Sequence, residues 1–254
     1  MAKIVVFDSG LGSLSIIKEI QKIVKADIVY FADQKNYPYG KKSQAQLNRI
    51  MEKTINLLEE KFMPDIIVVA SNTPSLMLNL ERKKIVGVKP PLKLAQKKSK
   101  SKKIAILATK SAINSKGLEN YINKNNIPKS YKIFKINGTN LVDLVESGKF
   151  LNKKNYCKKV IKENLENYII KEKIDTITLS STHLVFLKTL LKKEFPKVQF
   201  IDPGNLVATK ILLKIKNKQS KRNSLKIFTS GNVTDFKNKL NKIGINNKIN
   251  YLST

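Results

Sequence analysis

Short runs of β-branched residues alternate with longer amphipathic stretches along the whole chain of 254 residues. The expected strands are 3–8, 27–33, 65–71, 85–88, 103–109, 131–136, 175–181, 198–203 and 225–231, and the expected helices are 13–24, 44–61, 114–124, 152–171, 184–194 and 205–215. The strand-like runs are mostly apolar throughout, which is typical of parallel strands covered on both faces. The pattern therefore predicts an α/β fold with mostly parallel sheets.

Two of these apolar runs end in a similar way. "IIVVASNTPS" at 66–75 leads into Ser71, and "TLSSTHLVFL" at 178–187 leads into Ser181 and the chain's single histidine. An aspartate precedes each run, so the two stretches form a weak internal repeat, as expected of two similar domains. The Lys/Ser-rich run at 97–103 is the expected linker between them. Because ligands of open parallel sheets bind at the carboxyl ends of the strands, both endings are candidate sites.

The net charge of +30 points at first to a nucleic-acid partner, but the composition argues against one. The 49 basic residues are 46 Lys and three Arg, and abundant Lys, Asn and Ile reflect A/T-rich codons. Arginine, the better bidentate reader of phosphates and bases, is nearly absent. We therefore expect a solvated, lysine-coated surface and no nucleic-acid partner.

The remaining composition limits the class of protein. A single cysteine, Cys157, excludes an internal disulfide framework and a multi-cysteine zinc site. No apolar run reaches the roughly 18–20 residues of a membrane span. The opening "MAKIVVFDSG" has the pattern of a first strand, not of a signal peptide. We therefore expect a cytoplasmic protein without a membrane partner.

A series of motifs resembles one known family from end to end. In order, the motifs are "VFDSGLGSLSIIKEI", "YFADQKNYPYGKKS", "VVASNTPS", "GVKPPLKLA", "LATKSAINS", "VESGKF", "LSSTHLVFL" and "FTSGNVTDF". In number, order and spacing they resemble the glutamate racemases of the aspartate/glutamate racemase superfamily. The resemblance implies two Rossmann-like domains related by a pseudo-twofold axis, with the active site in the interdomain cleft. The expected domains are 1–95 plus 208–254, and 96–207.

The resemblance also implies a reaction. Glutamate racemases are isomerases that interconvert L- and D-glutamate without cofactor or metal and supply peptidoglycan synthesis for the cell wall. Glutamate is then the small-molecule partner, and the protein is a homodimer or a monomer. One group removes the α-proton from one face of the carbon, and a second delivers a proton to the other face. In the family both groups are cysteines, which can be tuned to give an accessible thiolate.

At both of these positions this chain carries serine, namely Ser71 and Ser181. A serine hydroxyl is a weaker acid than a thiol by roughly 5–7 pKa units, which is about 7–10 kcal/mol. We therefore predict very low or absent racemisation. Introduced replacement and natural drift both remain open as the origin of the serines.

The other site residues follow from the same resemblance. Asp8 and His183 are expected to assist the two catalytic positions, and the expected substrate-binding residues are Asp8, Ser9, Tyr39, Gly40, Asn72, Thr73, Thr182 and His183. Asp33 and Glu146 fall at acidic positions of the family without a firm role. Local structure offers simpler explanations for each residue: helix capping, turn formation or an ordinary buried histidine.

Several alternatives stay open at this stage. The chain could be a catalytically silent amino-acid-binding protein, or a racemase for a related acid such as aspartate, because Ala112 and Leu184 depart from the family pattern. "DSGLGS" is a weak match to a dinucleotide-binding loop. A serine hydrolase built on Ser181 and His183 would lack the G-x-S-x-G elbow.

Overall fold

The structure is a computed structural model that describes residues 2–78, 80, 82–215, 218 and 220–254. The chain forms two compact units, of which the first combines Met1–Val88 with Gly204–Thr254 and the second is Lys89–Pro203. Each unit contains one sheet, and every strand pair in both sheets is parallel. The predicted fold class, α/β with parallel sheets, is therefore confirmed.

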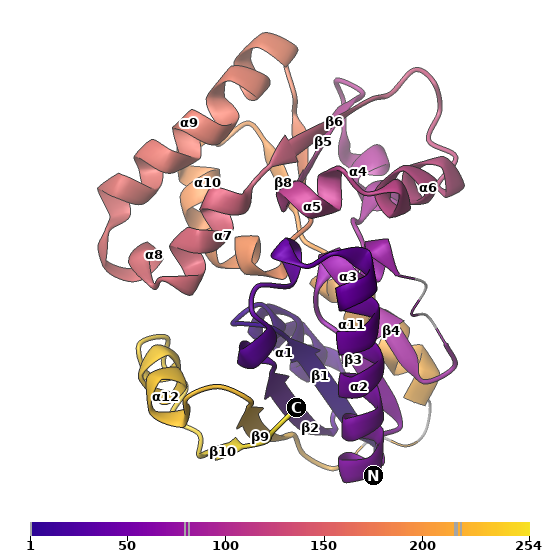
Figure 1. Ribbon diagram of the computed structural model, residues 1–254. Coiled ribbons are helices and arrows are strands. Elements are labelled where there is room, and N and C mark those ends of the chain that lie inside the picture. Colours follow the sequence, from indigo (N-terminus) through magenta and orange to yellow (C-terminus); the bar gives the residue numbers. More distant parts are fainter. Residues whose placement is uncertain (1, 79, 81, 216–217, 219) are drawn as a thin grey trace. The chain divides into compact units, whose positions relative to one another are not determined.

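The first unit has a six-stranded sheet in the order β10-β9-β2-β1-β3-β4 (Figure 1). Its strands are β1 (Lys3–Asp8), β2 (Asp27–Ala32), β3 (Ile66–Val69), β4 (Ile85–Gly87), β9 (Ser224–Thr229) and β10 (Ile249–Tyr251). Its helices are α1 (Ser13–Ile23), η1 (Gln34–Asn36), η2 (Tyr39–Lys41), α2 (Gln44–Phe62), α3 (Asn72–Met77), α11 (Gly204–Ile215) and α12 (Val233–Asn241).

Helices cover both faces of this first sheet. The crossovers from β1 to β2 and from β2 to β3 run in opposite directions along the sheet, so right-handed connections put α1 and α2 on opposite faces. On the α2 face, Leu47 and Met51 pack among Phe7 and Phe31 in one apolar cluster. On the other face α1 packs against α11, and Tyr30 meets Phe236 of α12 with ring centroids 5.9 Å apart. Burial on both faces explains why these strands are continuously apolar.

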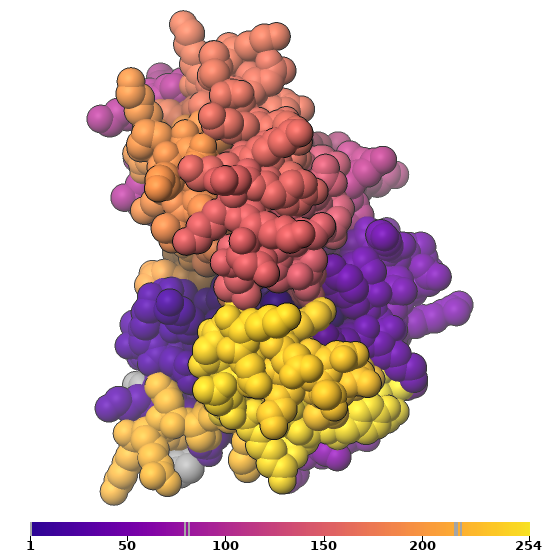
Figure 2. Space-filling view, turned by 90° about the vertical axis from the view of Figure 1, so that its left-hand side faces the viewer, coloured from indigo at the N-terminus to yellow at the C-terminus, as the bar shows by residue number. Residues whose placement is uncertain are grey.

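Residues from the two ends of the chain lie side by side in the first unit. Strand β9 pairs with β2 over the whole strand, from Asp27 opposite Ser224 to Ala32 opposite Thr229. Figure 2 shows the C-terminal residues in yellow, gathered into one continuous block beside N-terminal residues in indigo. The C-terminal stretch is therefore an integral part of the first sheet.

The second unit has a four-stranded sheet in the order β6-β5-β7-β8. Its strands are β5 (Lys103–Ala108), β6 (Lys132–Asn137), β7 (Thr176–Leu179) and β8 (Gln199–Ile201). Its helices are α4 (Leu92–Lys98), α5 (Lys110–Ile113), α6 (Lys116–Lys124), α7 (Thr139–Glu146), α8 (Lys149–Asn152), α9 (Lys154–Glu172), η3 (Thr182–Leu187) and α10 (Lys188–Glu194). Its main apolar cluster joins the sheet to α7, α9, η3 and α10, and a smaller cluster joins Ile104 to Ala95 of α4.

The two sheets repeat one topology. The order β2-β1-β3-β4 in the first unit corresponds to β6-β5-β7-β8 in the second. Just past β3, the N–H of Ala70 donates to the carbonyl of Phe7 at 2.8 Å. Just past β7, the N–H of Ser180 donates to the carbonyl of Leu107 at the same distance. The next residues, Ser71 and Ser181, therefore occupy equivalent places in their own units.

The Lys/Ser-rich run at 97–103, which we expected to be the linker, lies inside the second unit. The hydroxyl of Ser99 and the N–H groups of Lys100 and Ser101 donate to the carboxylate of Asp175 at 2.6–2.7 Å, which ties the run to the start of β7. The unit boundaries fall after Val88 and after Pro203 instead of after residues 95 and 207. The reason is that α4 packs against β7 and β8, and α11 packs against α1.

Among the described residues, no helix has both the length and the apolar character needed to span a membrane.

Candidate functional site

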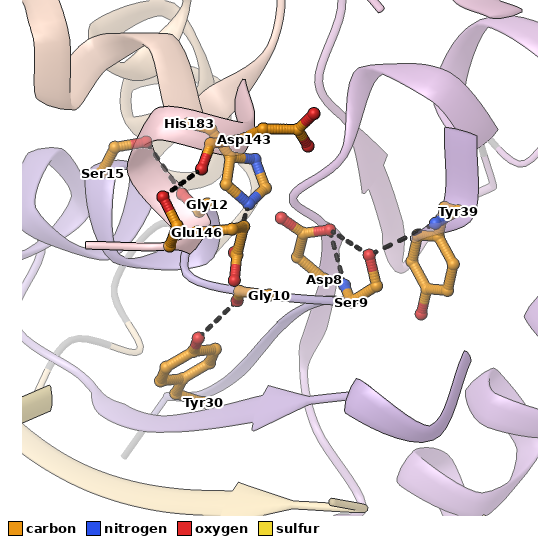
Figure 3. A network of polar contacts seen from close by, with 11 residues as sticks. Asp8, Ser9, Gly10, Gly12, Ser15, Tyr30, Tyr39, Asp143, Glu146 and His183 are labelled. Atoms are coloured by element: carbon orange, nitrogen blue, oxygen red, sulfur yellow. Dashed lines mark hydrogen bonds and ion pairs between the residues drawn. The ribbon is translucent and has the colours of Figure 1, made fainter. Parts of the chain in front are cut away.

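In the first unit, three of the expected site residues form one chain of hydrogen bonds at the carboxyl edge of the sheet. Asp8 is the last residue of β1 and is buried. The N–H of Ser9 donates to Asp8 Oδ1 at 2.6 Å, and the N–H of Tyr39 donates to Ser9 Oγ at 3.5 Å (Figure 3). The sequence-based grouping of Asp8, Ser9 and Tyr39 therefore corresponds to a physical network.

The side chain of Tyr39 faces the protein interior. Its hydroxyl donates to Asp33 Oδ2 at 2.8 Å, and its ring lies in the apolar cluster beside α2. Burial, together with the negative charge of Asp33, raises the pKa of Tyr39 well above its usual value. The hydroxyl therefore stays protonated and bound to Asp33. The backbone of Tyr39 and Gly40 begins the short helix η2.

Ser71, Asn72 and Thr73 lie at the end of β3 and in the first turn of α3. Ser71 is the N-cap residue of α3, yet its side chain makes no capping hydrogen bond. Asn72 is only 3% exposed, and neither Nδ2 nor Oδ1 has a hydrogen-bond partner among the described residues. A buried amide without partners costs about 1–3 kcal/mol, so a native one requires an explanation. A polar ligand with both a donor and an acceptor would supply one.

In the second unit, Ser181 repeats the geometry of Ser71. Ser71 has φ −136° and ψ 127°, and Ser181 has φ −140° and ψ 132°. Each is the N-cap residue of the helix that follows its strand, and neither side chain makes a capping hydrogen bond. The repeat seen in the sequence therefore extends to the backbone conformation of the two serines.

His183 lies two residues beyond Ser181, in η3 beside the buried Thr182. Its Nε2 is 2.7 Å from Oε1 of Glu146, at the end of α7, and both side chains are buried (Figure 3). A carboxylate that accepts from Nε2–H fixes the tautomer, so in the neutral ring Nδ1 carries the lone pair. Sequence reasoning gave Glu146 no firm role, and the structure shows that Glu146 orients His183.

The two units carry different ionisable groups near their strand-end serines, and these groups come from different places in the topology. Asp8 ends β1, whereas the last residue of β5, the corresponding strand, is Ala108. The second unit has instead the imidazole of His183 with its carboxylate partner Glu146. The first unit therefore presents a carboxylate beside its strand-end serine, and the second presents a histidine.

Three other residues that the sequence analysis named are buried in the protein interior. Leu184 is fully buried in the apolar cluster of the second unit, and Ala112 is buried in α5. Cys157 is buried in α9; burial raises the pKa of its thiol, and the charge of Lys149 opposes this in part. Within the described part of the chain, no group of three or more His, Cys, Asp or Glu side chains is placed to hold a metal ion.

Together, the fold and the sites define a class of protein: two similar parallel α/β units, each with a serine in the same backbone conformation after an equivalent strand. The chain is 33% identical over 228 residues to the glutamate racemase of Buchnera aphidicola subsp. Schizaphis graminum, covering 87% of this chain and 88% of that protein. It is 30% identical over 231 residues to the glutamate racemase of Leptospira borgpetersenii, covering 88% and 86%. The chain belongs to the glutamate racemase family.

Solved structures agree with this assignment. The crystal structure of glutamate racemase isoform RacE1 from Bacillus anthracis matches with a TM-score of 0.85 and 25% identity, over 99% of this chain and 97% of that one. The glutamate racemase from Aquifex pyrophilus matches with a TM-score of 0.73 and 28% identity, over 98% of each chain. No family model matches the sequence.

Proposed function

We propose that this protein binds glutamate as a glutamate racemase does, and that it racemises glutamate very slowly or not at all. The observation that carries the proposal is the pair Ser71 and Ser181, in equivalent backbone conformations at the two strand ends where the family resemblance places cysteines. The proposal includes a cytoplasmic location, a supply of D-glutamate to peptidoglycan synthesis in any active form, and a homodimer or monomer as the working state. It includes no cofactor or metal, because the reaction consists only of proton transfers.

The serines limit the chemistry. Racemisation requires one group to remove the α-proton and another to return a proton to the opposite face. Forming a serine alkoxide in place of a thiolate costs roughly 7–10 kcal/mol more, for a pKa difference of about 5–7 units. A barrier higher by that amount lowers the rate by about five to seven powers of ten. The carboxylate of Asp8 and the imidazole of His183 would have to recover most of this difference for the protein to be active.

Binding is expected to survive the loss of the thiols. The side-chain amide of Asn72, which has no hydrogen-bond partner in the described part of the chain, offers both a donor and an acceptor to the α-carboxylate and α-amino groups of an amino acid. Thr73, Ser9 and Thr182 add hydroxyl groups at the same strand ends, and all three are buried. These groups require no thiol, which is why affinity for glutamate and turnover of glutamate separate in this proposal.

Proton NMR of L- and D-glutamate in D2O tests the proposal. The parent protein and a variant carrying both Ser71→Cys and Ser181→Cys are compared, each with its glutamate affinity measured by calorimetry. We expect binding by both proteins and loss of the α-proton signal with the cysteine pair alone. Rapid exchange by the parent would contradict the pKa argument.

Controls separate the proposal from its main alternatives. Single Ser71→Cys and Ser181→Cys variants show whether both positions act, and Cys157→Ser in the paired variant shows that the native thiol is not involved. Glutamate binding without exchange by the cysteine pair would indicate an amino-acid-binding protein. Exchange of aspartate instead of glutamate would correct the substrate.

A further inference from the structure

The end of strand β9 contacts the loop that carries Tyr39. This loop, residues 33–41, is called the Tyr39 loop. We propose that Ser230, from the C-terminal part of the chain, is a positioning residue: it holds Asp33, and through Asp33 it holds Tyr39 and the loop in the arrangement that the site requires. The ordering of the loop by Ser230 does not depend on the proposed function. Only its consequence for glutamate binding rests on that function.

The pairing of β2 with β9 brings the two segments together. Ala32 lies opposite Thr229 at the end of the pair, and the N–H of Ser230 donates to the carbonyl of Ala32 at 3.1 Å. The Ser230 hydroxyl is buried and makes two further contacts: it donates to Asp33 Oδ1 at 3.0 Å and accepts from the N–H of Lys35 at 3.1 Å. One side chain of the C-terminal segment thus holds two residues of the Tyr39 loop.

Asp33 depends on these contacts because its carboxylate is fully buried. Burying a charge is costly unless hydrogen bonds compensate. Three side chains supply them: Asn36 Nδ2 at 2.9 and 3.0 Å, the hydroxyl of Tyr39 at 2.8 Å and the hydroxyl of Ser230 at 3.0 Å. Of these three donors, Ser230 alone comes from outside the loop. It therefore ties the loop's internal network to the sheet.

The residues on either side of Ser230 contact the same loop. The hydroxyl of Thr229 donates to Oε1 of Gln34 at 3.1 Å. A Cβ atom added at Gly231 would lie 2.7 Å from Oε1 and 2.8 Å from Cβ of Gln34, so only glycine fits this approach without a shift. Three successive residues at the end of β9 thus fit closely against the beginning of the loop, which makes a chance contact of one hydroxyl a poor explanation.

The hydrogen bonds continue from the loop to Asp8. Asp33 holds the Tyr39 hydroxyl, the N–H of Tyr39 donates to Ser9 Oγ, and the N–H of Ser9 donates to Asp8. Loosening Ser230 should therefore increase the mobility of the loop backbone and of the ligand contacts that it provides. Ser230 itself needs no contact with the ligand for this role.

The same strand provides a matched control. Ser224, at the other end of β9, donates its hydroxyl to Asp27 Oδ1 at 2.7 Å, and Asp27 is the first residue of β2. The pair Ser224–Asp27 thus repeats the bond of Ser230–Asp33 on the same two strands, but at the amino-terminal edge. Ser224→Ala removes a serine–aspartate bond from the same strand pair without touching the Tyr39 loop.

Hydrogen exchange of the loop amides tests the proposal without any ligand. In Ser230→Ala, the amides of Asn36, Tyr37 and Tyr39 should exchange about five to twenty times faster than in the parent, as expected for the loss of one or two hydrogen bonds to a charged or backbone group. Ser224→Ala should leave these rates unchanged, and Ser230→Thr, which keeps the hydroxyl, should restore them. Unchanged rates in a folded Ser230→Ala variant would overturn the proposal.

A second variant and a binding measurement complete the test. Tyr39→Phe removes one of the two donors to Oδ2 of Asp33, the other being Asn36 Nδ2. This variant should speed exchange of the Asn36 and Tyr37 amides even if Ser230→Ala fails to fold. Unchanged rates in Tyr39→Phe would also count against the proposal. The dissociation constant for D-glutamate should rise about five- to twentyfold in Ser230→Ala and stay constant in Ser224→Ala. Faster loop exchange with unchanged affinity would overturn the positioning role. If the parent itself does not bind D-glutamate, the proposed function fails, and the exchange rates still decide whether Ser230 holds the loop.

Discussion

The buried amide of Asn72 leads to a prediction in which stability and binding change in opposite directions. Replacing Asn72 with leucine, a side chain of similar size, should stabilise the free protein and abolish its affinity for glutamate. The reason is that both polar atoms of Asn72 lack partners among the described residues while its side chain is 3% exposed. A bound ligand that supplies the missing hydrogen bonds would remove this penalty, whereas leucine carries no polar atom to satisfy.

The magnitude follows from the cost of burying an unpaired amide. Removing that penalty should raise the free energy of unfolding by about 1–3 kcal/mol. A gain of about 2 kcal/mol corresponds to an increase in melting temperature of roughly 4–8 °C for a chain of this size. Leucine also has a higher helix propensity than asparagine, which adds a few tenths of a kcal/mol in the first turn of α3.

Differential scanning calorimetry and titration calorimetry with D-glutamate measure the two effects. Thr54→Val is the matched control, because Thr54 Oγ1, in α2, is also buried and has no hydrogen-bond partner among the residues that the structure describes. Its replacement removes a similar penalty. Both variants should melt at a higher temperature, and Asn72→Leu alone should lose binding. An Asn72→Leu variant that is no more stable than the parent, or that still binds D-glutamate, would refute the reasoning.

Two further predictions concern groups that lie apart from the site. Burial acts to raise the pKa of Asp175, but hydrogen bonds from Ser99 and Ser101 outweigh it and lower the pKa. The stabilisation of the folded protein by the Asp175 carboxylate is therefore fully present above about pH 4 and is lost as the pH falls through the lowered pKa. Asp175→Asn should lower the free energy of unfolding in urea by about 1 kcal/mol at pH 7 and by much less at pH 3. An equal loss at both pH values would contradict this. The Cys157 thiol is buried, and that burial raises its pKa. A thiol reagent should therefore label Cys157 within seconds in urea and hardly at all in the native protein. Rapid labelling of the native protein would show that α9 opens.

The sequence predicted the strands well because their pattern is simple. A strand covered on both faces must be apolar at nearly every position, and such runs are visible without knowledge of the fold. The first strand was expected at 3–8 and found at Lys3–Asp8, and the strand at 225–231 was found at Ser224–Thr229. The predicted fold class followed from these runs and their alternation with helices.

Short elements were harder to predict. Strand β10 has three residues, and it exists because β9 offers a partner edge. Helix α3 has six residues immediately after the strand-end serine and was not expected. The run at 97–103 has the composition of a linker, but the carboxylate of Asp175 binds it to the second unit. In each case a contact distant in sequence decided the outcome over local preference.

By itself the sequence determined the fold class, the family and the position of the two serines, because each depends on residue types and their order. The tertiary structure decided which side chains of the candidate site form hydrogen bonds with one another. It paired His183 with Glu146 across 37 residues and Ser230 with Asp33 across 197, and it left Asn72 buried without a partner in the described chain. The physical reason is that periodicity indicates which face of an element a side chain occupies, whereas parallel crossovers determine which distant strand ends meet at the edge of a sheet.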